Sequence, residues 1–305
     1  MLSPLRPLLS ASALSASASR LFASSFATTC NWSPNSSGHG WAQLINPTSI
    51  LRIYPALNDN YYYIIKNTDA SPTNCSPHTD YILSDCPEGC LTGVKDALKD
   101  SLKDSKEVSK TSPPTLHIFL THHHADHTAG LSSVQTWASS NSIPVTVHSH
   151  ASIPPSTLLP SSLKISSIIT HGHTPTHKSF SLPSLKTIIT GDALFSMGCG
   201  RVFTGDMDAA YEGLQNLKRE VEEDALVLCS HEYTESNGDF CLSLEEGFWG
   251  DDWRAVVERV EEVKVLREKG LPSVGTTFGE EKVWNPFLRV DRKEFERIRK
   301  LKDSF

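Results

Sequence analysis

One short motif constrains this chain more than any other: residues 121–127 read Thr-His-His-His-Ala-Asp-His. Four of these side chains can bind a metal ion, those of His122, His124, Asp126 and His127. Imidazole and carboxylate groups together suit zinc, iron or manganese. The motif therefore predicts a metal site, against the alternative of a histidine-rich surface loop that binds nothing.

The segments on either side place this motif on a turn between a strand and a helix. Residues 116–120, Leu-His-Ile-Phe-Leu, form a short apolar run that predicts a buried strand. Beyond Gly130, apolar residues recur at helical spacing over 131–138. A turn here lets the two side chains of His-x-His converge on one point and directs Asp126 and His127 toward a second point nearby.

Length and composition exclude several classes of protein. The 305 residues suffice for one large domain with an appendage or for two modest ones. The net charge of −7 argues against nucleic-acid binding. Apolar runs fall short of the ~20 residues that cross a bilayer, so no membrane association is expected. The cysteines, 7 in all, are scattered and favour a reducing compartment, and we interpret Cys86 and Cys90 as ordinary loop thiols.

The N-terminal segment differs in composition from the rest. Residues 1–58 contain three arginines and no acidic residue, and serine and alanine dominate residues 10–25. This composition predicts a transit peptide over residues 1–30 and a location in the mitochondrial matrix, with plastid or cytoplasm as alternatives. A plain disordered tail is the competing interpretation. Residues 31–48, rich in Gly, Ser and Asn, predict a loose linker.

Strand and helix signals alternate up to about residue 230, and only helical patterns follow. Strands are predicted at 49–54, 61–65, 81–83, 116–120, 145–147, 165–170, 179–182, 186–190 and 226–229. Helices are predicted at 91–102, 207–221, 253–266 and 291–302. This order indicates an α/β layered domain over 49–233, followed by a small helical domain over 234–305.

Further candidate ligands follow the predicted strands, where a sheet presents side chains at its edge. His173 comes after strand 165–170, Asp192 after strand 186–190, and His231 after strand 226–229. A single histidine at a strand end is more often structural, and we read His148 and His150 in that way. The joint occurrence of three such residues with the 121–127 motif predicts a two-metal site.

At this point the sequence resembles a known family. His122-x-His124-x-Asp126-His127, followed by His173, Asp192 and His231, is similar to the metallo-β-lactamase superfamily and, within it, to glyoxalase II, the hydroxyacylglutathione hydrolases. The matching stretches are Pro55-Ala56-Leu57-x-Asp59-Asn60-Tyr61, Gly191-Asp192-x-Leu194-Phe195, Gly198-Cys199-Gly200-Arg201, His231-Glu232-Tyr233-Thr234 and Asn285-Pro286-Phe287-Leu288-Arg289. The resemblance runs from about residue 50 to the end. It implies an α/β fold, a four-layer αββα sandwich with a small C-terminal α-helical domain.

The resemblance also implies a set of metal ligands. His122, His124 and His173 would hold one divalent ion; Asp126, His127 and His231 would hold a second, with Asp192 bridging both. Zinc is the first expectation, with iron or manganese as alternatives. Asp126 and Asp192 would hold the hydroxide shared by the two ions. The remaining histidines stand outside this set: His123 is expected to point elsewhere, His171 is extra to the family pattern, and His177 is expected to be structural.

The family's reaction is the hydrolysis of S-D-lactoylglutathione and related 2-hydroxyacylglutathiones to D-lactate and glutathione, the second step of methylglyoxal detoxification. A hydroxide bridging two metal ions attacks the thioester carbonyl, and the departing thiolate needs little acid assistance. The expected partner is a small-molecule glutathione thioester. The chain is expected to be a monomer.

Residues for the glutathione part of the substrate are implied by the same resemblance. Arg299 and Lys302, in the basic C-terminal helix, match the family's glutathione-binding pattern, and Arg201 and Tyr233 fit the same role. Phe203 stands where some members carry a tyrosine, so one hydroxyl contact is absent. Departures also occur at residues 204–206 and 238–249, and they put affinity and acyl preference in doubt more than reaction type.

Two other functions compete with this interpretation. A persulfide dioxygenase of the same superfamily would use a single iron held by two histidines and one aspartate, and would lack the C-terminal region. Residues 285–289 with Arg299 and Lys302 argue against it. A non-catalytic metal-dependent binding protein would keep the fold and lose ligands, whereas all seven are present here.

Overall fold

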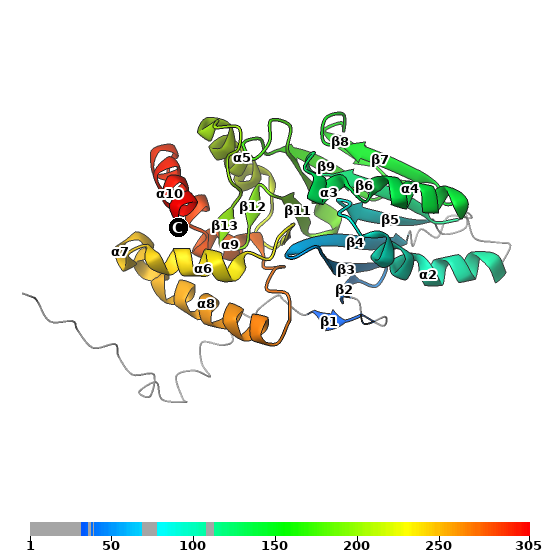
Figure 1. Cartoon of the computed structure of the whole chain (residues 1–305), viewed down its shortest axis with the longest axis horizontal. Helices are drawn as coiled ribbons and strands as arrows, with labels where there is room; N and C mark the ends of the chain where they lie inside the picture. Colours follow the sequence, from blue (N-terminus) through cyan, green and yellow to red (C-terminus); the bar gives the residue numbers. More distant parts are fainter. Residues whose placement is uncertain (1–31, 36–37, 39, 69–77, 108–112) are drawn as a thin grey trace, which may run out of the picture.

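The computed structural model describes residues 32–35, 38, 40–68, 78–107 and 113–305. Within them, two β-sheets lie next to each other with helices on both outer sides (Figure 1). The helices that follow residue 233 gather at one end of the molecule (Figure 1). The predicted transit peptide, residues 1–30, lies outside the described residues.

The first sheet contains seven strands in the spatial order β1 to β7. From β1 to β5, each strand is antiparallel to the next one in this order, whereas β5 is parallel to β6 and β6 is parallel to β7. Their bounds are Ser33–Pro34, Trp41–Asn46, Ser49–Ala56, Asn60–Thr68, Thr79–Ser84, Thr115–Leu120 and Val145–Ser149. Because β5 and β6 are parallel neighbours, the segments after Ser84 and Leu120 start side by side at one edge of the sheet.

The second sheet contains five strands in the order β14-β11-β10-β9-β8. Their bounds are Leu226–Cys229, Thr187–Gly191, Lys178–Leu182, Lys164–Ile169 and Ser156–Leu158. Strands β11 and β14 are parallel, so the residues after Gly191 and Cys229 also emerge together. A short hairpin of β12 (Leu194–Phe195) and β13 (Gly198–Cys199) follows β11.

Some of the described helices begin at a side-chain cap, whereas others have no capping side chain. Their bounds are α2 Leu91–Glu107, α3 Ala125–Thr128, α4 Leu131–Ser140, α5 Met207–Glu220, α6 Thr234–Ser243, α7 Glu246–Trp249, α8 Trp253–Glu268, α9 Phe278–Trp284 and α10 Arg292–Ser304, with 3-10 turns at Pro183–Leu185, Gly250–Asp252 and Pro286–Leu288. Asp206 caps α5, Asp291 caps α10, and Thr277 forms a reciprocal capping box with Glu280 on α9.

Side chains along each strand alternate between the two faces of its sheet. As a result, three layers of hydrophobic core separate the four layers of secondary structure. In β4, Tyr61, Tyr63 and Ile65 enter the core between the sheets, while Tyr62 and Ile64 face the core beneath α2 and α4. This follows because successive side chains of a strand point to opposite faces. The third core joins the second sheet to α5 and the C-terminal helices. The helical region therefore shares a hydrophobic core with the sandwich.

The segment before β3 differs from the prediction. Trp41–Asn46 forms strand β2, antiparallel to β3. Trp32 is buried, and its indole Nε1 donates a hydrogen bond to the carbonyl oxygen of Val274 at 2.9 Å. The loose linker predicted over residues 31–48 is therefore wrong for these residues. The segment is ordered by pairing and packing with residues distant in sequence, which its polar composition does not reveal.

Among the residues described, no helix combines the length and the apolar character that a membrane span requires.

Asn285 ties the helical region to the hairpin beside the second sheet. Its side chain is fully buried, donates to the carbonyl oxygens of Phe195 and Gly198 at 3.0 Å each, and accepts from the backbone N–H of Phe287 at 3.1 Å. Asn285→Ala leaves these buried groups unpaired. We expect it to lower the free energy of unfolding by roughly 3 kcal/mol in urea denaturation.

Asn216 supplies the matched control. Its side chain also donates to a backbone carbonyl, that of Ile169, but the bond is exposed to water. Asn216→Ala should cost less than about 1 kcal/mol. Equal losses in the two variants would contradict the role assigned to Asn285.

Candidate metal centre

The loop between β6 and α3 carries the histidine-rich motif to the edge where the two sheets meet. Strand β6 is buried from Leu116 to Leu120, and the burial continues through Thr121 and His122. An isolated β-bridge between Asn60 and His231 joins the rims of the two sheets at this edge. The fold thereby brings together the ends of β6, β11 and β14.

Three imidazoles converge on one point. The Nε2 atom of His122 lies 3.0 Å from Nδ1 of His124, and that Nδ1 lies 3.1 Å from Nε2 of His173. Nitrogens bound about 2.0–2.1 Å from a tetrahedral ion lie roughly 3.3 Å apart. The three nitrogen atoms therefore have the spacing of a metal's ligands.

A second group forms beside the first. The Oδ2 atom of Asp126 lies 3.4 Å from Nε2 of His127 and 3.5 Å from Nε2 of His231. The ligand atoms of these three residues all lie within 4.8 Å of one another. The structure thus brings together the second set predicted from the sequence.

Asp192 lies between the two groups. Its Oδ1 atom lies 3.5 Å from Nε2 of His127, and its Oδ2 atom lies 3.4 Å from Nε2 of both His173 and His231. The preceding Gly191 has a left-handed φ of +54°, and a Cβ there would meet the Thr121 side chain at 2.8 Å. Glycine at this position lets β11 turn Asp192 into the cluster.

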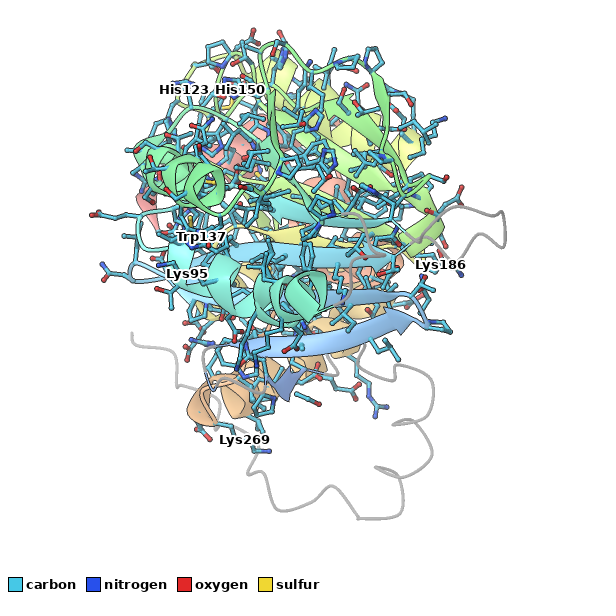
Figure 2. The ribbon with its side chains drawn as sticks, turned by 90° about the vertical axis from the view of Figure 1, so that its right-hand side faces the viewer. Lys95, His123, Trp137, His150, Lys186 and Lys269 are labelled. Atoms are coloured by element: carbon cyan, nitrogen blue, oxygen red, sulfur yellow. The ribbon has the colours of Figure 1, made fainter. Side chains whose placement is uncertain are left out.

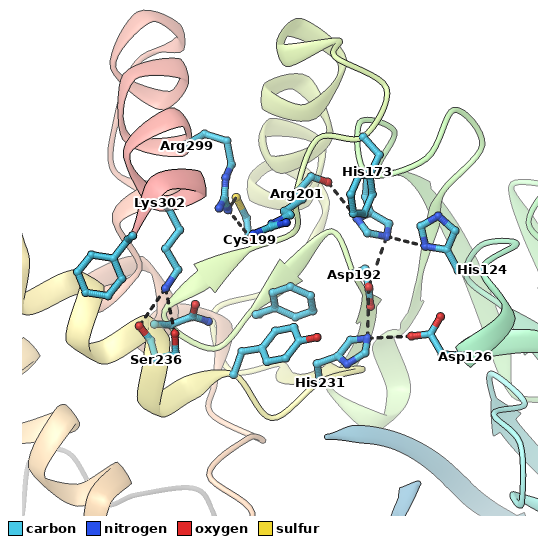
Figure 3. A pocket seen from close by; sticks show the side chains of 15 residues that line it. His124, Asp126, His173, Asp192, Cys199, Arg201, His231, Ser236, Arg299 and Lys302 are labelled. Atoms are coloured by element: carbon cyan, nitrogen blue, oxygen red, sulfur yellow. Dashed lines mark hydrogen bonds and ion pairs between the residues drawn. The ribbon is translucent and has the colours of Figure 1, made fainter. Parts of the chain in front are cut away.

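Unpaired buried atoms show that the cluster fits a cation. His127 Nε2 and Asp192 Oδ1 are buried and make no hydrogen bond. Leaving such atoms unpaired is costly unless something else binds them. Figure 3 shows His124, Asp126, His173, Asp192 and His231 pointing toward one another at one end of a cavity. The nitrogen and oxygen donors suit a divalent ion of the zinc, iron or manganese type.

The first group consists of neutral imidazoles. Burial lowers the pKa of His122, His124 and His173 below the ordinary value, and neighbouring histidines add to the effect. A neutral imidazole is the form that binds a metal ion. These three side chains are therefore ready to coordinate without first losing a proton.

The second group concentrates negative charge. The neighbouring imidazoles of His127 and His231 hold the pKa of Asp126 far below its usual range, and they overcome the effect of burial to do the same for Asp192. In turn, although burial opposes it, hydrogen bonds to Asp126 and Asp192 raise the pKa of His231 to about 10. Two ionised carboxylates thus attract positive charge to this point, which a bound cation would supply.

Asp85 holds two residues of the histidine-rich loop in place, although no role was predicted for it from the sequence. It is buried, and its Oδ2 atom accepts from Nδ1 of His127 at 2.9 Å and from Oγ1 of Thr121 at 2.9 Å. Its Oδ1 accepts from the Thr121 backbone N–H at 2.8 Å. The carboxylate therefore orients the His127 ring. Asp85 directly follows strand β5, which is parallel to β6, the strand that leads into the histidine-rich motif. This position was the sequence signal from which a role at the site could have been inferred.

Asp59 and Asn60 hold the side chains of His231 and Asp126 in place. Asp59 Oδ1 accepts from Nδ1 of His231 at 2.8 Å, and Asn60 Nδ2 donates to Oδ2 of Asp126 at 3.1 Å. Asp59 lies in the turn between β3 and β4, and Asn60 is the first residue of β4. Both belong to a stretch that matches the family, and neither was predicted to have a role at the site.

The remaining histidines lie outside the cluster. His123 belongs to none of the groups that could hold a metal; its ring lies 5.1 Å from that of His124 and 6.1 Å from that of His150, beside which it is labelled in Figure 2. His148 stacks on Phe119. His177 is fully buried and accepts a hydrogen bond from the backbone N–H of Asp192 at 3.1 Å, consistent with the structural role expected for it. His171 belongs to none of the groups that could hold a metal.

A cavity of about 760 Å³ opens from the metal cluster toward α6 and α10. Phe203 lies against the rings of His124 and His173 at centroid distances of 5.8 and 5.2 Å, and Tyr233 stacks on His231 at 4.8 Å. Arg201 lines the cavity with a largely exposed side chain. The structure therefore brings these three predicted substrate residues beside the cluster.

The two predicted C-terminal residues differ from each other. Lys302 lines the cavity, and its Nζ donates to the carbonyl and hydroxyl oxygens of Ser236 at 2.9 and 3.3 Å (Figure 3). Arg299 is only 3% exposed; its guanidinium donates to the Cys199 carbonyl oxygen at 2.7 Å and to Asp303 at 3.0 Å. Arg299 thus lines the cavity with a guanidinium already bound to the protein.

Two family models match the chain. The model described as "Hydroxyacylglutathione hydrolase C-terminus" matches residues 232–305. The model described as "Metallo-beta-lactamase superfamily" matches residues 156–231. Together they cover the second sheet and the C-terminal helices.

Curated relatives extend the similarity over most of the chain. The hydroxyacylglutathione hydrolase of Ruegeria pomeroyi is 32% identical over 252 residues, which cover 80% of this chain and 88% of the relative. That of Rhodopseudomonas palustris is 32% identical over 250 residues, covering 79% and 87%. A solved metallo-beta-lactamase from Staphylococcus aureus has a TM-score of 0.51 at 15% identity, over 84% of this chain and 72% of that chain. The predicted metallo-β-lactamase sandwich is thereby confirmed.

A substitution at Asp59 tests whether its hydrogen bond to His231 strengthens metal binding. Asp59→Asn keeps the shape of the side chain but removes the charge that orients His231. We expect affinity for divalent zinc to fall about tenfold, in a competition titration against a chromogenic chelator. Asp224→Asn, which removes a carboxylate paired with Lys186 outside the cluster, should leave the affinity unchanged. A loss of similar size in both variants would contradict the assigned role of Asp59.

Proposed function

The chain belongs to the hydroxyacylglutathione hydrolase family, and from that premise we propose that it hydrolyses the thioester of S-D-lactoylglutathione, and of related 2-hydroxyacylglutathiones, to D-lactate and glutathione. One observation carries this proposal. A seven-residue cluster able to hold two metal ions opens into a cavity that also contains cationic side chains from the C-terminal region. The metal cluster would act on the thioester bond, and the cationic side chains would bind the two carboxylates of the glutathione part.

We propose that His122, His124 and His173 hold one divalent ion and that Asp126, His127 and His231 hold a second, with Asp192 shared between them. The grouping of ligand atoms and the unpaired atoms of His127 and Asp192 support this assignment. Zinc is the ion we propose first, because imidazole nitrogen and carboxylate oxygen donors suit it.

When bound, two such ions supply an ionised water at neutral pH and polarise a carbonyl oxygen. The protein's own contribution is orientation. Asp126 is partly exposed and lines the cavity, so its carboxylate can accept a hydrogen bond from a water held beside the thioester carbon. The thiolate is a good leaving group and needs little acid assistance to depart.

Recognition of the glutathione part rests on Lys302 and Arg201. The Lys302 ammonium lies over the rings of Phe240 and Phe305 at 5.2 and 5.1 Å, beside Ser236. The largely exposed Arg201 can swing toward a carboxylate. We propose that Arg299 acts differently from the expectation: its bond to the Cys199 carbonyl fixes the hairpin from which Arg201 extends.

Phe203 and Tyr233 form the apolar walls nearest the cluster. Phe203 is 64% exposed and lines the cavity beside the cluster, so its ring is open to a ligand there. It meets the rings of two predicted metal ligands in edge-to-face arrangements. We propose that the acyl group and its thioester lie against this ring.

We also propose that the protein is a monomer in the mitochondrial matrix. The location rests on the composition of residues 1–30. A fluorescent protein fused behind residues 1–30 should enter mitochondria. Fluorescence that stays in the cytoplasm would contradict the location and leave the enzymatic proposal intact.

The central activity is tested by following the loss of thioester absorbance with S-D-lactoylglutathione and metal-loaded protein. We expect turnover that chelation abolishes and zinc restores, with no oxygen consumed when glutathione persulfide is supplied. Oxygen uptake with persulfide and no thioester cleavage would instead support a dioxygenase.

His231→Ala tests the ligand set. Removing this imidazole should lower bound metal and turnover together, with turnover reduced about a hundredfold or more. Elemental analysis of the purified variant gives the metal content. His171→Ala is the control, because this histidine lies only two residues before His173 but belongs to none of the metal-holding groups. Full metal content and full turnover in His231→Ala would remove this residue from the site.

Lys302 predicts a pH dependence of substrate binding. Burial, followed by the nearby charge of Arg299, lowers the pKa of Lys302 to about 8. Lys302 therefore carries a positive charge below about pH 8 and loses it above that pH. The KM for the glutathione thioester should rise as the pH increases through this value. Lys302→Met should raise KM about tenfold at pH 7, equivalent to ~1.4 kcal/mol, and remove the rise.

Lys300→Met is the matched control, since Lys300 lies on the same helix and pairs with Glu296 at the surface. It should leave KM and its pH profile unchanged. A Lys302 variant whose KM and pH profile equal those of the parent would remove Lys302 from the glutathione site.

A further inference from the structure

Glu232 is a buried acidic residue that no step of the proposed reaction uses. It stands between His231, a candidate metal ligand, and Tyr233, whose ring stacks on that histidine. His231 and Tyr233 line the cavity, whereas the side chain of Glu232 is only 5% exposed. A carboxylate buried in this way is costly unless several hydrogen-bond donors meet it. Its partners therefore show which parts of the structure it connects.

One set of hydrogen bonds joins Glu232 to the first sheet. Its Oε2 atom accepts from the hydroxyl group of Tyr61, on β4, at 3.1 Å. Its backbone N–H donates to the carbonyl oxygen of Asp59 at 2.8 Å, and the N–H of Tyr61 donates to the carbonyl oxygen of Ser230 at 2.7 Å. Backbone and side chain therefore both fix this segment along the start of β4.

A second set of hydrogen bonds joins Glu232 to the helical region. The hydroxyl group and the backbone N–H of Ser273 donate to Oε1 and Oε2 at 2.5 and 2.9 Å. The guanidinium of Arg267, near the end of α8, donates to Oε2 at 3.3 Å. The hydroxyl group of Thr234, the first residue of α6, donates to Oε1 at 2.9 Å. One carboxylate thus connects the segment after β14 to two parts of the helical region.

The position of His231 is sensitive to a displacement of the residue that follows it. Its Nε2 atom lies 3.5 Å from Asp126 and 3.4 Å from Asp192, in the group of atoms that could hold an ion. Distances between a metal ion and its ligands vary by only about 0.2 Å, so a small shift of the ring removes a ligand atom from reach. The bonds that fix Glu232 therefore also restrain the His231 ring.

We propose that Glu232 is a positioning residue, which joins the helical region to the first sheet by hydrogen bonds and thereby holds His231 where it can bind a metal ion. Glu232 itself belongs neither to the metal-holding groups nor to the cavity wall. The helical region then contributes to metal binding as well as to recognition of the glutathione part. This role rests on the ligand role proposed above for His231.

Two substitutions separate the hydrogen bonds of Glu232 from its charge. Glu232→Met keeps the length of the side chain and removes every acceptor. Glu232→Gln removes the charge but keeps one acceptor oxygen, and its amide can donate to the hydroxyl groups of Ser273 and Thr234, which accept as well as donate. Zinc affinity of the full chain is measured by competition with a chromogenic chelator. Urea denaturation gives the free energy of unfolding of each variant.

We expect Glu232→Met to bind one of two zinc ions about tenfold more weakly, and Glu232→Gln to stay within about twofold of the parent. Asp80→Leu is the matched control. Asp80 is fully buried and accepts from the backbone N–H of Ser161 at 2.7 Å, at the end of β5 remote from the metal centre. Its loss should lower the free energy of unfolding, as Glu232→Met does, but leave zinc affinity unchanged.

Three results would overturn the proposal. The first is unchanged zinc affinity in Glu232→Met. The second is an equal loss of affinity in Glu232→Met and Glu232→Gln, because the charge of the carboxylate would then act on the ions without any positioning by hydrogen bonds. The third is an equal loss in Asp80→Leu, which would show that reduced stability alone weakens metal binding.

A gentler variant keeps the test open if Glu232→Met does not fold. Tyr61→Phe combined with Arg267→Met removes one partner from each side of the carboxylate and should also lower zinc affinity; an unchanged affinity would overturn the proposal. Full zinc affinity in His231→Ala would remove the ligand role of His231 and this proposal with it. A zinc-binding protein that leaves the thioester intact would count against the proposed reaction alone.

Discussion

The buried carboxylate of Asp192 is the constraint around which this structure is arranged. It is almost inaccessible to water, is held ionised by its histidine neighbours, and faces both groups of candidate ligands. A buried negative charge is costly unless positive charge meets it closely. The imidazoles of His127 and His231 supply part of that charge, and the proposed cations supply the rest.

The fold meets this requirement by aligning strand ends. Parallel pairing of β5 with β6 and of β11 with β14 makes four segments emerge at one edge of the two sheets. Each contributes polar groups there, as ligands or as supports for ligands. The C-terminal helices share a core with the second sheet, so Lys302 is held beside the same edge. The proposed catalytic and recognition groups thus lie at one cavity.

The candidate ligands could be predicted from the sequence because their chemistry is distinctive and each follows an apolar strand. The strands bearing them were predictable for the same reason. Asp59 and Asp85 were not singled out, since a lone aspartate after a strand also occurs in ordinary turns. Their role depends on contacts with His231 and His127, more than 40 residues away in sequence.

Other features depend on tertiary contacts that no local pattern records. Strand β2 was taken for part of a linker because its pairing with β3 provides order that its composition lacks. Arg299 was expected to meet substrate, and this stays a prediction: the residue lines the cavity, while its guanidinium also bonds inward to the Cys199 carbonyl oxygen, a contact that the basic helical pattern does not record.

X-ray absorption spectroscopy of the zinc-loaded protein tests the central claim most directly. The account predicts a metal–metal distance of about 3.5–4 Å that disappears in Asp192→Asn, because that carboxylate is shared between the ions. A spectrum showing one isolated ion, or a metal–metal distance that persists unchanged without the Asp192 carboxylate, would contradict it.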